Sequence, residues 1–283
     1  MAGIKNKYRF KGHESFVLRE GWLNKGMEAL RCNPRLFSEN SGADELGVGV
    51  NMAKSIRYWM KCAGLLEEKK NGIFLSPVGR MIHEKDAYLE DIFSLWIIHC
   101  SIAGNMEMAT VWNLFFNRFD AEEFQQEYLK HEMKRMVSVL PEVGKYSERS
   151  VEDDCDALLR MYTKQKEEDK TPEEKNSSPF AMLGLIRFTG GAYHREQPAL
   201  NRVPEEVVWY LMPENRDAFS IDELLEGENS PGKLLNLKRN GLVELLERLA
   251  AKNVIEINRT AGLDMVYLKS LKNREEILSD YYE

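Results

Sequence analysis

The sequence predicts a mainly α-helical fold with small β wings: an N-terminal winged helix-turn-helix, a central helical body and a C-terminal winged-helix-like module. Helical periodicity dominates the 283 residues, two pairs of short strands each follow two helices, and one highly charged stretch interrupts the chain. The expected divisions are 1–86 for an arm and the winged helix-turn-helix, 87–162 for the body, 163–178 for a flexible loop and 179–283 for the last module.

The first winged unit is expected within residues 41–80. Ser41 is expected to cap a short helix that runs through Leu46. A second helix follows from about Val50 to Ala63, and Gly64 can adopt the left-handed conformation that ends it. Two short strands then flank the hairpin turn Lys69-Lys70-Asn71-Gly72 before another helix begins.

The second helix of this unit has an apolar stripe and a polar arc. At roughly 100° per residue, five apolar side chains share one face: Met52, Ile56, Trp59, Met60 and Ala63. The opposite arc and the wing carry side chains that can donate to phosphates and reach base edges. The sequence thus predicts a DNA-binding set of Asn51, Lys54, Ser55, Arg57, Tyr58, Lys61, Lys69 and Lys70. Winged helices that dock proteins also have polar faces, so that alternative stays open.

The charge is distributed unevenly along the chain. The formal net charge is −7, yet residues 1–86 carry 15 Lys and Arg against 10 Asp and Glu, whereas the remainder carries 24 against 36. Such an asymmetry is expected when one part of a protein meets a polyanion. The first ten residues, MAGIKNKYRF, do not resemble a signal peptide, and no apolar stretch approaches the roughly 20 residues of a membrane span. We expect a cytoplasmic protein without membrane contact.

The body is predicted to consist of four helices: Tyr88–His99, Thr110–Phe119, Ala121–Val139 and one from about Val151 to Thr163. The first of these is apolar on most sides, so we expect a buried helix in which His99 is a hydrogen-bonded core residue. The stretch 163–178 contains nine charged side chains and no large apolar one, which is typical of a mobile loop.

The C-terminal module is predicted from a second helix, helix and wing pattern. Ser220 can cap a helix through Leu225, and another helix runs from Leu242 to Lys252. Strands are expected at Val254–Ile257 and Met265–Leu268. The outer face is mixed in charge (Glu244, Glu247 and Arg248), which suits a protein partner or a homodimer contact better than phosphate.

Catalytic signals are sparse. The four cysteines lie 30 or more residues apart without a CxxC pair, so most are expected to be buried free thiols. No phosphate-binding GxxxxGKS/T loop indicates ATP use, and we expect no metal centre. The candidates for proton transfer or metal binding are His13, Glu14, Asp91 and Asp154. Alternatively, His13 or Arg19 bonds to backbone in an arm packed on the winged unit, and acidic residues 152–156 begin a helix whose dipole favours them.

Successive blocks of the sequence carry a resemblance: FKGHESFVLREGWLNKGMEAL, LGVGVNMAKSIRYWMKCAGLL, DAYLEDIFSLWIIHCSI, VWNLFFNRF, DDCDALLRMY and TAGLDMVYL. Over almost the whole chain they resemble the bacterial domain-of-unknown-function family numbered four thousand and seven, which is similar to the SspB-like B component of Ssp-type DNA phosphorothioation systems. The resemblance implies sulfur modification of DNA in phage defence, together with cysteine desulfurase, ATPase and phosphosulfate-reductase-like partners. It also implies a strand-nicking activity, and it extends the DNA role to Leu46–Trp59.

Three hypotheses follow. The leading one is a double-stranded DNA-binding component of a phosphorothioation system. The second is a DNA nickase that uses Mg²⁺ or Mn²⁺ as its cofactor, for which an alanine scan would cover His13, Glu14, Glu90, Asp91, Asp154 and Asp156. The third is a non-enzymatic adaptor, or a winged-helix protein of the transcription-regulator type, that docks partner proteins.

Overall fold

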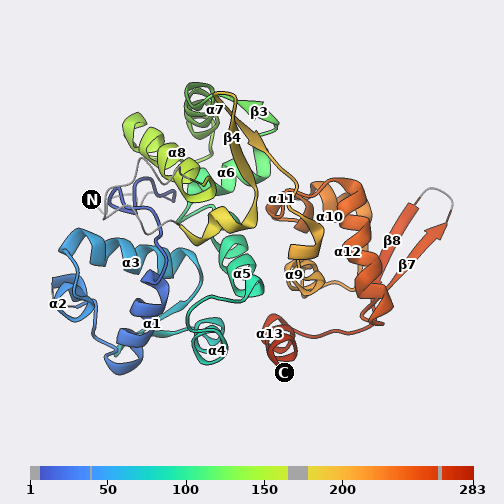
Figure 1. Cartoon of the computed structure of the whole chain (residues 1–283), viewed down its shortest axis with the longest axis horizontal. Coiled ribbons are helices and arrows are strands. Elements are labelled where there is room, and N and C mark those ends of the chain that lie inside the picture. The colour runs from blue at the N-terminus through green and yellow to red at the C-terminus, as the bar shows by residue number, and fades with distance from the viewer. Residues whose placement is uncertain (1–6, 39, 165–177, 261–262) are drawn as a thin grey trace.

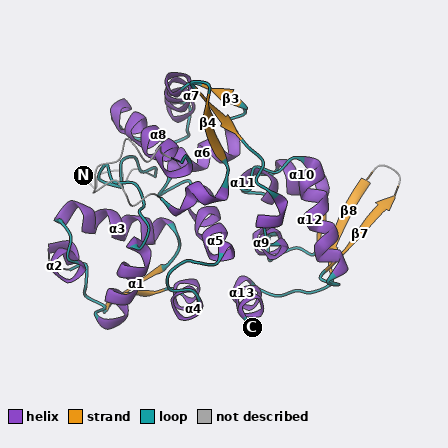
Figure 2. Cartoon of the chain, viewed as in Figure 1, coloured by secondary structure: helices purple, strands orange, loops and turns teal. Residues whose placement is uncertain are grey.

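The computed structural model describes residues 7–38, 40–164, 178–260 and 263–283. Helices predominate in the described residues and are accompanied by three small antiparallel sheets (Figures 1 and 2). The expected class, mainly α with small β elements, is confirmed. None of the described helices has both the length and the apolar composition of a membrane span. The expected loop 163–178 falls almost entirely outside the described residues.

The N-terminal elements gather at one end of the molecule (Figure 1). They are α1 (Trp22–Cys32), the 3-10 turn η1 (Asn40–Gly42), α2 (Ala43–Leu46), α3 (Val50–Cys62), β1 (Leu66–Lys69), β2 (Gly72–Leu75) and α4 (Pro77–Lys85). Helix α3 buries the predicted Ile56, Trp59 and Met60 against α1 and neighbouring elements. Gly64 adopts a φ of 70° after the helix, as the sequence predicted.

The capping role predicted for Ser41 is wrong. Ser41 lies inside η1 with a φ of 55°, and Gly42, with a φ of 77°, is the residue that precedes α2. A Cβ on Gly42 would lie 2.8 Å from the carbonyl oxygen of Leu36, so the chain passes too close to that carbonyl for a larger residue. Ser41 and Gly42, both in the left-handed conformation, thus stand where the sequence predicts an extended N-cap serine.

The predicted hairpin after α3 is confirmed. Strands β1 and β2 pair antiparallel, with Lys69 opposite Gly72 at the turn. A Cβ on Gly72 would lie 2.7 Å from the carbonyl oxygen of Pro34, and the amide of Ile73 donates to that same oxygen at 2.9 Å. The hairpin is therefore held against the loop that follows α1.

The central helices differ from the predicted ranges at their ends. They are α5 (Ile92–Ala103), α6 (Thr110–Arg118), α7 (Gln126–Ser138) and α8 (Glu148–Tyr162). Helix α5 begins after Asp91, whose carboxylate accepts from the amide of Phe93, so Tyr88 is not helical. The predicted continuous helix 121–139 is also wrong. Residues Glu123–Phe124 form strand β3 because a later strand supplies its partner.

A three-stranded sheet joins parts of the chain on either side of residues 165–177. Strand β5 (Ala192–Arg195) pairs with β3 on one side and with β4 (Ile186–Thr189) on the other. Phe124, Tyr193 and Phe188 lie opposite one another across the three strands. The ring of Phe124 also packs on Phe115 and Phe119, which ties the sheet to α6.

The C-terminal elements begin with two 3-10 turns and end with a helix. They are η3 (Pro179–Leu183), η4 (Leu200–Arg202), α9 (Glu205–Leu211), β6 (Ala218–Ser220), α10 (Ile221–Glu226), α11 (Pro231–Leu234), α12 (Arg239–Ala251), β7 (Ile255–Thr260), β8 (Leu263–Leu268) and α13 (Arg274–Tyr282). Ser220 caps α10 by accepting from the amide of Glu223, as predicted. Strand β6 adds a third strand to the predicted β7–β8 hairpin, and the sequence pattern predicted neither α11 nor α13.

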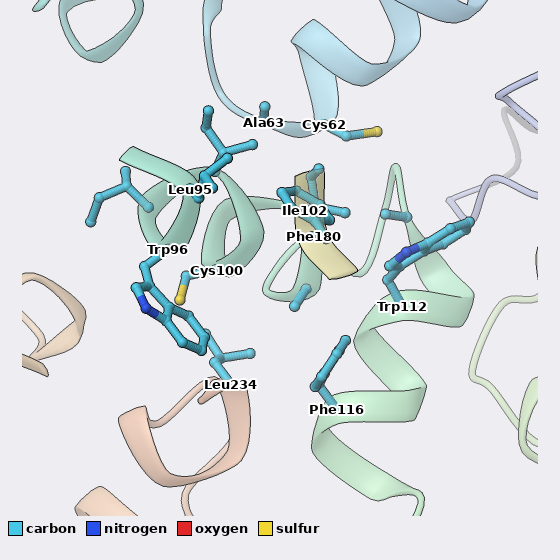
Figure 3. Packing of buried hydrophobic residues seen from close by; sticks show 14 of the residues in the cluster. Cys62, Ala63, Leu95, Trp96, Cys100, Ile102, Trp112, Phe116, Phe180 and Leu234 are labelled. Atoms are coloured by element: carbon cyan, nitrogen blue, oxygen red, sulfur yellow. The ribbon is translucent and has the colours of Figure 1, made fainter. Parts of the chain in front are cut away.

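The core runs from the end of α3 through α5 and α6 to α11 (Figure 3). His99 lies in its centre, fully buried: Nε2 donates to the Leu234 carbonyl at 2.8 Å, and Nδ1 is 2.7 Å from the Tyr162 hydroxyl. The prediction of a hydrogen-bonded core histidine is therefore confirmed. Burial lowers the pKa of His99 to about 4. Three of the four cysteines are also buried free thiols, and Cys32 is exposed.

Candidate nucleic-acid interface

The outer face of α3 presents a row of cations. Lys54, Arg57 and Lys61 lie off the apolar stripe, on the side that the helical period leaves toward solvent. Lys54 is exposed, and its Nζ lies 3.4 Å from Oδ1 of the exposed Asn51. These four positions of the predicted DNA-binding set therefore share one accessible helix face.

A carboxylate on β1 partly neutralises this row. Glu68 Oε1 accepts from Lys61 Nζ at 3.1 Å and lies 3.5 Å from Arg57 Nη2. Hydrogen bonding and charge from these two cations lower the pKa of Glu68, so the carboxylate stays ionised over the neutral range. Among the described residues, Lys54 has no ion-pair partner.

Two members of the predicted set do not face solvent, and their expected exposure is wrong. Ser55 is fully buried, and its hydroxyl donates to the Phe16 carbonyl at 3.2 Å. Tyr58 is 4% exposed, and its hydroxyl donates to the Met108 carbonyl at 2.8 Å. The chain at Phe16 and the loop before α6 cover this side of α3, and helical periodicity cannot reveal these contacts.

The remaining predicted cations lie on the hairpin. Lys69 Nζ is 3.1 Å from the carboxylate of Glu67 and 5.5 Å from the centre of the Phe74 ring. Lys70 is exposed in the turn between the two strands. The hairpin tip thus carries two lysines, on a different element from the cations of α3.

The N-terminal arm, residues 8–15, crosses α3 and adds a cation that the sequence patterns did not single out. The Arg9 guanidinium lies 5.4 Å from the centre of the Tyr58 ring. The arm approaches so closely that a Cβ on Gly12 would lie 2.3 Å from Cε2 of Tyr58. The only signal for Arg9 was the mixed basic and aromatic composition of the first ten residues.

A cavity of about 260 Å³ lies between the arm and α3, here called the arm recess. Four cations, one carboxylate and four uncharged residues line it: Arg9, Lys54, Arg57, Lys61, Glu14, Gly12, Ser41, Tyr58 and Met108. The structure thus brings Glu14, a predicted catalytic candidate, to the same place as four predicted DNA-binding residues, Lys54, Arg57, Tyr58 and Lys61.

Two more of the four predicted acid-base candidates, His13 and Asp154, are outside the lining of the arm recess. His13 and Asp154 are buried, and His13 Nε2 lies 2.8 Å from Asp154 Oδ1. The amide of Lys11 donates to the same carboxylate oxygen at 2.9 Å. Burial raises the pKa of Asp154, while the hydrogen bonds from His13 and Lys11 oppose the rise. The partner of His13 is thus a carboxylate from α8 rather than the predicted backbone group.

The acidic run 152–156 pairs with bases instead of starting a helix. Helix α8 begins at Glu148, so these residues lie within it and the proposed helix-dipole explanation is wrong. Glu152 is 2.8 Å from Lys134, Asp153 is 2.6 Å from Lys11, and Asp156 is 2.9 Å from Lys130. The run therefore fastens the arm and α7 to α8.

The last catalytic candidates lie outside the arm recess. Asp91 caps α5 and also accepts from the Tyr281 hydroxyl at 3.1 Å. Glu90 is exposed in the preceding loop. In the part of the chain that the structure describes, no group of three or more His, Cys, Asp or Glu side chains is arranged to hold a metal ion.

The mixed face predicted on the C-terminal module is largely paired within itself. Arg248 Nη2 donates to Glu244 at 2.6 Å, and Arg259 Nη2 donates to Glu247 at 2.5 Å. Glu244, Glu247 and Arg259 are exposed, and Arg248 is half-buried. The face therefore carries mutually compensated charges rather than a field of one sign.

The comparisons with known proteins agree with the resemblance over the whole chain. The model for a protein of unknown function (DUF4007) matches residues 10–282. The chain belongs to the DUF4007 family. No curated protein matches this DUF4007 member.

Two solved structures share the fold of this DUF4007 protein. One, a magnesium ion-bound SspB crystal structure, gives a TM-score of 0.83 at 23% identity and covers 96% of this chain and 87% of that chain. The other, an SspB crystal structure, gives a TM-score of 0.81 at 22% identity and covers 96% and 86%. The expected SspB-like fold is confirmed.

Proposed function

We propose that this protein is the double-stranded DNA-binding component of a bacterial DNA phosphorothioation system. The observation that carries the proposal is the exposed row of Lys54, Arg57 and Lys61 on one helix, continued by Arg9 at the arm recess. Closely spaced cations on an exposed helix suit a nucleic-acid backbone, because phosphate contacts supply most non-specific affinity. The shared fold with SspB supports the choice of system.

In this proposal α2, α3 and the β1–β2 hairpin act as a winged helix-turn-helix. Helix α3 lies along the groove, and Lys69 and Lys70 reach the adjacent backbone from the hairpin. The working partners would be the cysteine desulfurase, ATPase and phosphosulfate-reductase-like proteins of such a system in the cytoplasm. Ser55 and Tyr58 are left out of the contact set because they are buried.

A salt titration of DNA binding tests the proposal. If about four cations neutralise phosphates, the logarithm of the affinity falls with the logarithm of salt concentration at a slope of roughly −3.6, from about −0.9 per contact. The double variant Lys54→Glu and Lys61→Glu should lose gel-shift binding to a 30-base-pair duplex while keeping its circular dichroism spectrum. The matched control, Lys238→Glu with Lys269→Glu, makes the same charge change on the C-terminal part and should bind as before. Equal binding by both double variants would exclude this surface.

DNA nicking with a divalent metal is a second candidate function. It is favoured by the position of Glu14 at the cation-lined arm recess and by the magnesium ion bound in one of the two SspB structures. Mg²⁺ is commonly held by one or two carboxylates together with substrate phosphates, so Glu14 fits such a site only with DNA present. Supercoiled plasmid with Mg²⁺ or Mn²⁺ should be relaxed by the wild type and not by Glu14→Gln. Glu45→Gln, an exposed residue of α2 outside the recess, is the control, and absence of relaxation by the wild type would contradict nicking.

A further inference from the structure

Duplex binding on the face of α3 does not explain why four cations line the arm recess. Four cations border a single cavity of about 260 Å³, and Glu14 is the one carboxylate among its lining residues. Within the described residues, neither Arg9 nor Lys54 has an ion-pair partner. The cavity therefore holds two cations, Arg9 and Lys54, that no carboxylate of the described residues pairs with.

The uncharged residues Tyr58 and Met108 of the arm recess offer few hydrogen-bond acceptors to a ligand. The Tyr58 hydroxyl is already committed to the Met108 carbonyl at 2.8 Å. Arg9 covers a face of the Tyr58 ring, so a nucleobase would have to displace the guanidinium to stack there. Among the described residues, Arg9 and Lys54 have no ion-pair partner, and Arg57 and Lys61 share the single carboxylate of Glu68, so these cations can donate to the oxygens of an anion.

The arm that supplies Arg9 is fixed from behind. The Arg9 amide donates to Thr110 Oγ1 at 3.3 Å, and the buried His13–Asp154 contact follows four residues later. Lys11, Glu14 and Ser15 all have left-handed backbone, with φ of 54°, 49° and 70°. Residues held in such conformations need surrounding contacts to keep them there and are frequent at binding sites. The backbone that carries Arg9 is thus held in place before any ligand arrives.

We propose that the arm recess binds a phosphomonoester, the terminal phosphate of a DNA strand. A single phosphodiester within a duplex carries one charge and two free oxygens, so it would neutralise only one of the two unpaired cations, Arg9 and Lys54. A terminal phosphate carries about two charges near neutral pH and three acceptor oxygens, which matches a cavity lined by several donors better. This inference rests on the proposed function, because it adds strand ends to the DNA that the protein binds.

The experiment distinguishes binding to the ends of a DNA strand from binding to the duplex itself. Fluorescence anisotropy would compare a covalently closed dumbbell duplex, which has no ends, with linear duplexes of the same sequence that carry hydroxyl, 5′-phosphate or 3′-phosphate ends. We expect one phosphorylated form to bind about tenfold more tightly than the hydroxyl form, the scale of a charge-assisted hydrogen bond. The 5′ and 3′ arms identify which end enters the recess.

Variants locate the effect. Arg9→Gln should abolish the preference for the phosphorylated end, whereas Lys70→Gln at the hairpin should weaken binding to every duplex by the same factor. Thermal unfolding would verify that both variants are folded. Equal affinity for phosphate and hydroxyl ends would overturn the inference, and so would a preference that survives in Arg9→Gln. If the dumbbell still binds in that case, the proposed duplex-binding function stands. If phosphorylated ends bind and the dumbbell does not, the end-binding inference stands and the proposed duplex-binding function is contradicted.

Discussion

Glu68 sets how much positive charge α3 presents to a polyanion. Its carboxylate lies within 3.1 Å of Lys61 and 3.5 Å of Arg57, so the two cations can reach phosphate only in competition with it. Exposed pairs of this kind add little to folding stability, about 0–1 kcal/mol. Their removal should therefore change binding more than it changes folding.

The variant Glu68→Gln is expected to bind duplex DNA severalfold more tightly at low salt. The salt slope should become steeper by about 0.9 for each cation that gains a phosphate. A salt titration by anisotropy measures both quantities. Glu45→Gln removes the same charge from an exposed position that contacts Asn33 rather than a cation, and it serves as the control. Equal gains in affinity by the two variants would show that Glu68 does not compete with phosphate.

His99 should make the stability of the protein depend on pH. Its pKa is about 4 in the folded protein, below the ordinary 6.5 that applies when the chain unfolds. The unfolded chain therefore binds the proton first as the pH falls, so stability is greatest above pH 6.5 and declines toward pH 4. The difference corresponds to a free energy of unfolding of about 3 kcal/mol.

Urea unfolding of wild type and His99→Gln at several pH values between 4 and 7.5 checks this expectation. The variant should be less stable at pH 7.5, since it loses a buried hydrogen-bonded ring, but its stability should fall less steeply as the solution is acidified. His131→Gln changes an exposed histidine and should retain the wild-type slope. Parallel slopes for all three proteins would contradict a buried neutral His99.

At the scale of elements, the arm and α3 form one unit despite being separate segments. The backbone at Gly12 lies where a Cβ would be 2.3 Å from the Tyr58 ring, whose hydroxyl is hydrogen-bonded and cannot swing away freely. Gly12→Ala is expected to lower the free energy of unfolding by about 1–3 kcal/mol through overpacking. Gly49→Ala, with open space at the start of α3, should stay within about 0.5 kcal/mol of wild type. Thermal unfolding compares them, and similar losses would contradict the tight arm contact.

Elements whose signals are local could be predicted from the sequence. Helix α3 and both hairpins follow from periodicity and turn residues within a few positions. Strand β3 could not be predicted, because its two residues become a strand only through pairing with β5 about 70 positions later.

The candidate site divides in the same way between local and distant signals. The exposed side of α3 gave Lys54 and Lys61 correctly as surface cations, but the burial of Ser55 and Tyr58 depends on the arm and on Met108. Arg9 and Glu14 lie in the site because the arm crosses α3. The arm has no regular secondary structure, so no periodicity in the sequence could predict its path.

At the scale of the whole molecule, α13 connects the end of the chain to the N-terminal elements. It packs against α4 and α9, and Figure 1 places it beside α4. The Tyr281 ring stacks on Phe93 with centres 3.9 Å apart, and the Tyr282 and Ser94 hydroxyls are hydrogen-bonded. Ile277 and Leu278 of the same helix are buried.

Removal of residues 273–283 is expected to uncover Phe93 and to destabilise the protein by at least about 3 kcal/mol, since each buried apolar side chain contributes roughly 1.5–3 kcal/mol. Hydrogen–deuterium exchange should rise first in α4 and in the start of α5. The variant Tyr282→Phe, which loses only a hydroxyl, should show a smaller rise in the same segments. Unchanged exchange there after the truncation would contradict the bridging role.

The contact between His13 and Asp154 also has a consequence for how the protein can evolve. A substitution that removes either residue leaves a polar or charged partner stranded in the interior, which is costly, whereas a paired replacement by apolar residues avoids that penalty. The two positions are therefore expected to change together among DUF4007 sequences. A chimera that takes the arm from one DUF4007 protein and α8 from another would fold well only when both parents have the same kind of pair, polar or apolar, at these two positions.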